Sequence, residues 1–284
     1  MKQMDAGELL ERYAAGERDF REVDLEGAFL GGAHLNGINL RESSLTRVIF
    51  TGATLSQANL READLSYSSL QGDFSQANLI SSNLTEANLT AAKLTYSGMR
   101  AANLTRAKLA SADLSYSILN EAIMREANLN KAILVDAFIG RANLTQANLE
   151  GANLQGANLT SAILIGANLR GANLANATMH GINATGSMMN DADFSKSKLN
   201  SANLTNAKLR GANLREAQLA WTTLRGADLT EAKLFRAKLY WSNFTGANLT
   251  RTMLMDATMD QVNFRNAILD GTIFPRGVDM AQAT

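Results

Sequence analysis

The 284-residue sequence contains no cysteine and one proline, Pro275. The absence of cysteine excludes disulfide scaffolds, thiolate metal sites and cysteine nucleophiles. No run of 18 apolar residues occurs, so we expect no transmembrane helix. The first residues include acidic side chains and no apolar stretch, unlike a secretory signal peptide. We therefore expect a cytoplasmic protein.

The sequence also has no net charge and few aromatic residues. Its 27 Lys and Arg balance its 27 Asp and Glu, and aromatics make up 6% of the chain. A small acidic excess within residues 1–70 is offset by a small basic excess in the remainder. Neither excess is large enough to predict nucleic acid or a membrane as a partner.

What the sequence has in abundance is a five-residue repeat. Residues 150–174 read EGANLQGANLTSAILIGANLRGANL, five blocks that each end in Leu. On a helix, a step of five rotates a side chain by about 140°, which would scatter the leucines around the axis. In an unbroken strand, an odd step would alternate them between faces. The chain must therefore turn once in every block.

Each block has an inward side, an outward side and a corner. Ala and Leu lie two residues apart, so an extended segment points both inward and the Asn between them outward. The other two residues make the corner, where glycine is frequent and suits unusual backbone angles. The register runs from Phe20 to Leu70 and, after a four-residue block at Gln71–Phe74, on to Phe274. That shortened block is either a tolerated kink or a functional irregularity.

The blocks ANLQG, ANLTS, ADLTE and ANLRG resemble the A(N/D)LXX signature of the pentapeptide-repeat family. The resemblance covers about residues 16–274. It implies an all-β fold, a right-handed quadrilateral β-helix with four blocks per coil and about 13 coils, in which each coil contacts only its neighbours. Both ends of the chain resemble cyanobacterial members of the family, which include regulators of heterocyst differentiation.

The first residues predict a helix that covers one open edge of the stack. Asp5 is a candidate N-cap, and good helix formers with an apolar face follow it over about residues 6–15. We therefore predict three segments: a capping helix in residues 1–15, the repeat in residues 16–274, and a tail in residues 275–284. Pro275 ends the last strand because it lacks a backbone donor.

The sequence offers no constellation for catalysis, and we predict that the protein is not an enzyme and has no cofactor or metal. Its two histidines, His34 and His180, lie too many blocks apart to meet in a rigid stack. No nucleophile elbow or phosphate-binding loop occurs, because the glycines of GANLQGANL recur every five residues, as corners require.

Function is therefore expected on the outer surface, and two classes remain. One is a scaffold or regulator that binds another protein, as the cyanobacterial members of the family do. The other is a DNA mimic that binds type II topoisomerase, as members that confer fluoroquinolone resistance do. A mimic needs a dense acidic surface, whereas residues 71–274 carry more bases than acids. Charge therefore favours the protein-binding scaffold.

Residues 20 apart should stack, and this spacing singles out two surface clusters. The first is an apolar stripe, interpreted either as a partner-binding face or as packing between stacked strands. It consists of Tyr96, Tyr116, Ile118, Val135 and Phe138.

The second cluster contains the only two tryptophans, which should stack on one corner. We interpret it either as a homodimer interface or as indoles that shield each other and rest on the stems of Arg225 and Lys238. It consists of Trp221, Phe235, Tyr240, Trp241 and Met255.

Overall fold

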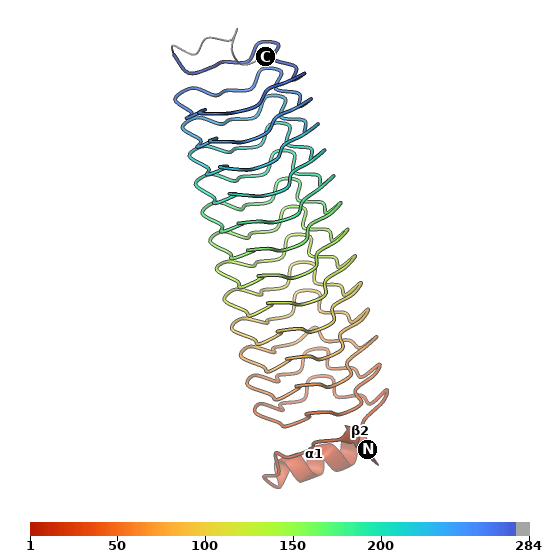
Figure 1. The fold of residues 1–284 in the computed structure, drawn as a ribbon. Coiled ribbons are helices and arrows are strands. Elements are labelled where there is room, and N and C mark those ends of the chain that lie inside the picture. Colours follow the sequence, from red (N-terminus) through yellow and green to blue (C-terminus); the bar gives the residue numbers. More distant parts are fainter. Residues whose placement is uncertain (277–284) are drawn as a thin grey trace. The chain divides into compact units, whose positions relative to one another are not determined.

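The computed structural model describes residues 1–276. The chain forms two compact units, Met1–Asn143 and Leu144–Thr284, and each is described by itself. In both units the chain turns at every fifth residue and returns to stack on itself (Figure 1). No helix within residues 1–276 is long and apolar enough to cross a bilayer.

The first unit begins with the three regular elements of the chain's described part. These are strand β1 (Lys2–Gln3), helix α1 (Ala6–Ala14) and strand β2 (Val23–Asp24). Strand β1 pairs in parallel with β2, so it continues the stack by one strand at this end. Asp5 caps α1, because its Oδ1 accepts a hydrogen bond of 2.8 Å from the Glu8 amide. A helix is therefore present where the sequence predicted one over about residues 6–15.

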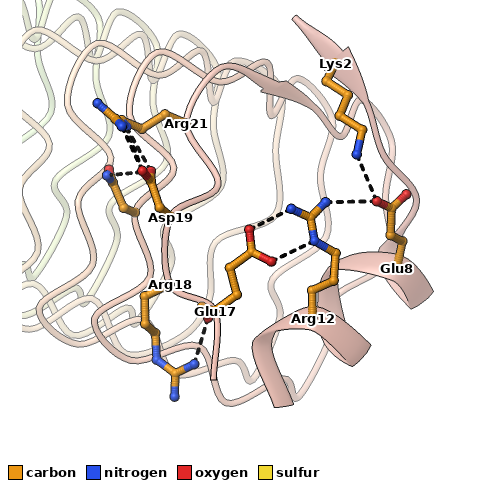
Figure 2. Close-up of polar contacts among 8 residues, drawn as sticks. Lys2, Glu8, Arg12, Glu17, Arg18, Asp19 and Arg21 are labelled. Atoms are coloured by element: carbon orange, nitrogen blue, oxygen red, sulfur yellow. Dashed lines mark hydrogen bonds and ion pairs between the residues drawn. The ribbon is translucent and has the colours of Figure 1, made fainter. Parts of the chain in front are cut away.

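A chain of ion pairs ties α1 to the segment that follows it. The Arg12 guanidinium donates to Glu8 Oε1 at 2.9 Å and to Glu17 Oε1 at 2.6 Å (Figure 2). Lys2 Nζ also lies 3.2 Å from Glu8 Oε1. Hydrogen bonds from Lys2 and Arg12 lower the pKa of Glu8, and a hydrogen bond from Arg12 lowers that of Glu17.

Beyond residue 24 the structure is a ladder of single parallel bridges between residues 20 apart. In a typical step of the first unit, the Leu84 amide donates to Asn103 O at 2.7 Å. The Asn103 amide donates back to Ser82 O at 2.9 Å. The second unit repeats the arrangement, as in the bridges Asn183–Asn203 and Asn203–Thr223. Four blocks therefore close one coil in each unit, and the inward-facing residues make a continuous core of buried Leu and Ala.

The outward Asn of a block stabilises the corner that follows it through side-chain hydrogen bonds. Asn83 Oδ1 accepts from the Thr85 amide at 3.2 Å and from Thr85 Oγ1 at 2.6 Å. This turn, closed by an asparagine side chain, satisfies a corner amide that no strand can reach. The preference for Asn or Asp before the inward Leu, and for Thr or Ser after it, follows from these two hydrogen bonds.

The shortened block at Gln71–Phe74 is a tightened corner with no residue extruded. The ladder passes through it with four bridges 19 residues apart, from Thr54–Asp73 to Ser69–Asn88. Gly72 makes the short turn, and a Cβ there would lie 2.5 Å from Ala53 O. The tightened corner therefore depends on a glycine, because only a residue without a Cβ can approach the backbone of the preceding coil this closely.

Residues 277–284, most of the predicted tail, lie outside the described residues. The division into segments 1–15, 16–274 and 275–284 stays a prediction, as do the coil number and the right-handed sense.

Candidate functional site

The two tyrosines of the predicted stripe stack on each other at one corner of the first unit. The rings of Tyr96 and Tyr116 have centroids 4.9 Å apart and an interplanar angle of 8°. Their side chains are nevertheless 59% and 43% exposed, so each ring keeps a large area in contact with water. The coil repeat sets this spacing, because residues 20 apart occupy equivalent corner positions in consecutive coils.

Ile118 and Phe138 lie on the face beside that corner. They form a parallel bridge with each other, and Gly98 precedes Ile118 in the same column. Each takes the outward position that Asn or Asp usually fills, and they are 46% and 49% exposed. Four of the five predicted residues are thus exposed and lie at one corner and its adjoining face.

The fifth residue, Val135, belongs to the same corner but not to the column of the tyrosines. Its carbonyl accepts from the Tyr116 amide at 2.9 Å, and its side chain is half-buried. The position that repeats Tyr96 and Tyr116 in this coil is occupied by Asp136. The predicted stripe missed Ile133, which is 40% exposed in the outward position of the preceding face. The sequence could have identified Ile133, because it is an apolar residue in an outward position that Asn or Asp usually fills.

Charged side chains border Ile118 and Phe138 on the corner at the other edge of their face. Glu121 pairs with Arg141 and lies 3.5 Å from a terminal nitrogen of Arg100. The hydrogen bond from Arg141 and the charge of Arg100 lower the pKa of Glu121. Two cations share one carboxylate, so this border carries a net positive charge.

The tryptophans of the second unit also stack. The rings of Trp221 and Trp241 have centroids 5.1 Å apart and an interplanar angle of 2°, while the side chains are 62% and 52% exposed. Tyr240 lies next to them, half-buried, and its carbonyl accepts from the Trp221 amide at 2.9 Å. The indoles therefore shield one face each and leave their edges in water.

The remaining residues of this cluster lie on the preceding corner. The Phe235 ring is covered by the guanidinium groups of Arg215, 5.2 Å from its centroid, and Arg236, at 4.7 Å. Met255 follows Phe235 by one coil and is 39% exposed. The cations of this region thus rest on Phe235, and within residues 1–276 none lies over an indole.

Reactive groups are scattered over the described residues. His34 Nδ1 lies 3.2 Å from Thr54 Oγ1 in the first unit, and His180 belongs to the second. Residues 1–276 contain no cluster of three His, Cys, Asp or Glu side chains that could hold a metal ion. An open hollow of about 580 Å³ lies beside α1 and is lined by residues that include Glu8, Glu26 and Phe29.

Among solved structures, the chain is similar to HetL, a protein involved in heterocyst differentiation regulation in the cyanobacterium Nostoc sp. strain PCC 7120. The two are 29% identical over 97% of this chain and 99% of HetL, with a TM-score of 0.32. Rfr23 from the cyanobacterium Cyanothece 51142 is 26% identical over 36% of this chain and 66% of that one, with a TM-score of 0.30. QnrB1, a plasmid-mediated fluoroquinolone resistance protein, is 16% identical over 93% and 95%, with a TM-score of 0.18. No curated protein sequence matches the chain.

A model of pentapeptide repeats matches eight times, with copies that together run from residue 19 to residue 274. The match spans the same blocks whose outward Asn and inward Leu build the ladder of both units. The chain therefore belongs to the pentapeptide-repeat family.

Proposed function

We propose that this protein is a non-enzymatic scaffold or regulator that binds another protein through an outer face of its repeat. The observation that carries the proposal is the Tyr96–Phe138 stripe, defined as Tyr96, Tyr116, Ile118, Val135 and Phe138. A column of outward positions filled by polar residues needs no partner, whereas large exposed apolar side chains gathered on one face are typical of interaction sites. The bordering Arg100 and Arg141 favour a partner that presents a carboxylate beside its apolar residues.

The family resemblance implies a right-handed quadrilateral β-helix of about 13 coils. We further expect a cytoplasmic location, because the first residues are unlike a secretory signal peptide, and no nucleic-acid or membrane partner, because the charge is balanced. A rigid stack suits a scaffold because its outward residues keep fixed positions, so little ordering entropy is lost on binding.

The DNA-mimic alternative is supported less well. Such a surface needs carboxylates that are free to imitate phosphates, but several carboxylates of the described chain are held by arginines. Examples are Glu62 with Arg61, Glu126 with Arg106, and Glu231 with Arg251. A gyrase supercoiling assay separates the two functions, since a mimic would inhibit the enzyme at low salt and lose that effect in high salt.

The stripe is tested by replacing Phe138 with Asp. Because Phe138 is half exposed, Phe138→Asp should leave the melting temperature nearly unchanged but abolish retention of partners from a native lysate of the source organism. Phe29→Asp is a matched control, because Phe29 also occupies an outward position and is 68% exposed, but lies in a different column, paired with Ile49. Equal retention by wild type and Phe138→Asp would remove the stripe from consideration.

A further inference from the structure

One column of charges in the second unit alternates in sign. Lys196, Glu216, Arg236 and Asp256 lie 20 residues apart at the second position of the same corner. All four are exposed and have φ between 56° and 58°, so their side chains leave the backbone in the same way. Within the described residues only one step of this column closes an ion pair, Arg236 to Asp256 at 3.7 Å. Lys196 and Glu216 form no ion pair there.

An alternating column is complementary to an inverted copy of itself. A two-fold axis perpendicular to the column, midway between Glu216 and Arg236, sets Glu216 opposite Arg236 of a second copy. The same operation sets Lys196 opposite Asp256 of that copy, and the symmetry repeats both pairs. A parallel arrangement about this corner would instead place each charge against its own equivalent, which is repulsive.

The outward residues of the adjoining face are also compatible with an antiparallel second copy. Its outward column, Lys198–Gln218–Lys238–Thr258, is linked by consecutive bridges. Inversion places Gln218 opposite Lys238, and Lys198 opposite Thr258, so no like charges meet.

The next corner carries the tryptophans, and inversion places Trp221 opposite Trp241. One coil further out, Asn200 faces Asp260. Asn200 Oδ1 already accepts from the Ala220 amide at 3.0 Å, which leaves its NH₂ group to donate to that carboxylate.

We propose that this surface of the second unit binds a second copy of the chain in antiparallel orientation. Association would bury the edges of both indole pairs, which supply the apolar centre of the contact, and would close four ion pairs at its border. An inverted second copy of the chain matches the alternating charges of the column by symmetry, whereas complementarity to an unrelated protein would require a separate matching pattern of charges on that protein. The contact is small, so we expect a dissociation constant of about 10–100 µM.

Charge exchange between two variants tests the orientation. In Glu216→Arg alone, and in Arg236→Glu alone, the central pairs of an antiparallel dimer become repulsive. Each variant should lose roughly tenfold or more in affinity and sediment as a monomer where the wild type is dimeric. An equimolar mixture of the two variants should sediment as a dimer, because each central pair then joins an arginine to a glutamate.

Tryptophan emission provides an independent readout, since Trp221 and Trp241 are the only tryptophans. The emission of the wild type should shift to the blue as its concentration rises through the dissociation constant. Trp241→Lys should abolish the dimer, while Arg225→Glu, a charge reversal at an exposed position of another corner, should leave it intact.

Three results would each overturn the proposal. The first is a wild type that stays monomeric up to about 200 µM. The second is a dimer that survives both single charge reversals. The third is a mixture of the two variants that stays monomeric although each melts at the wild-type temperature.

Discussion

The corner residues of this chain adopt a left-handed backbone conformation that usually favours glycine. The second residue of almost every corner has φ near +60°, whatever its side chain, and even Trp221 and Trp241 have φ of 61° and 58°. A left-handed residue with a Cβ costs about 1 kcal/mol, which the two flanking ladders of hydrogen bonds must offset at each corner. Glycine is thus convenient at these corners but required at few of them.

Gly72 is a position where glycine is required, for a different reason. A Cβ at residue 72 would meet Ala53 O at 2.5 Å and Phe50 O at 3.2 Å, and both atoms belong to backbone that cannot move freely. Gly72→Ala should therefore lower the free energy of unfolding by about 1–3 kcal/mol. Chemical denaturation of the two proteins measures the difference.

Gly98→Ala is the control for that experiment, because the nearest atom to a Cβ there is Ile80 Cγ1 at 3.8 Å. Its stability should stay within about 1 kcal/mol of the wild type or rise slightly. If both substitutions cost the same, the tightened corner at Gln71–Phe74 does not depend on the close approach of Gly72.

At the scale of elements, α1 is held to the first coil partly by charge. Arg12 joins Glu8 on the helix to Glu17 beyond it, and the guanidinium also lies 5.5 Å from the centroid of the buried Phe20 ring. Leu9 is fully buried beneath the helix. The helix is therefore held over the open edge of the stack by the buried side chain of Leu9 and by the ion pairs of Arg12.

Because the pKa values of Glu8 and Glu17 are lowered in the folded chain, their contribution to stability depends on pH. It is present in full above the ordinary carboxyl pKa of about 4 and is lost as the pH falls through the lowered folded values. Amide hydrogen exchange in α1, corrected for intrinsic rates, should therefore accelerate below about pH 4 relative to exchange in the coils.

Arg12→Gln should reduce this pH dependence, because it deletes the cation that both carboxylates share, while the hydrogen bond from Lys2 continues to lower the pKa of Glu8. If the amides of α1 in the wild type are equally protected from hydrogen exchange at pH 3 and pH 7, the ion pairs of Arg12 do not hold the helix in place.

A coil is the second kind of element, and its stability comes from the inward residues. Leu159 is fully buried in the second unit, and its amide donates to Thr178 O in the next coil at 2.7 Å. Leu159→Ala should cost about 2–5 kcal/mol in denaturant unfolding, and Leu159→Asp should cost more because it buries an unpaired charge. Gln155→Ala, at an exposed corner position, should change stability by less than about 0.5 kcal/mol. A harmless Leu159→Ala would contradict the inward assignment.

At the scale of the whole molecule, the repeat itself could be predicted from the sequence because one rule governs each block. The period of five determined which residues face inward, and Leu159, Met179 and Ala184 are all buried as expected. At Ala184 the large inward residue is replaced by a small one, and Ile182, 1% exposed, fills the space two positions earlier. Spacing also predicted the stacking of Tyr96 on Tyr116 and of Trp221 on Trp241.

What the period could not predict is how side chains arrange themselves where the rule leaves freedom. The spacing already places Val135 one position before the tyrosine column, but it could not predict that the Val135 side chain is half-buried. The guanidinium groups of Arg215 and Arg236 lie over the ring of Phe235, which the spacing could not predict because it depends on side-chain rotamers. The roles of both clusters as binding surfaces stay predictions.

Site-specific photocrosslinking shows directly whether the Tyr96–Phe138 stripe lies against another protein in the cell. The photoreactive residue p-benzoylphenylalanine would replace Phe138 in one protein and Phe29 in another, and both would be irradiated in cells of the source organism. Both positions are exposed and outward-facing but lie in different columns, and the control position is the more exposed of the two. We expect a discrete covalent adduct with another protein from position 138 that is absent from position 29. No adduct at position 138, or the same adducts from both positions, would contradict it.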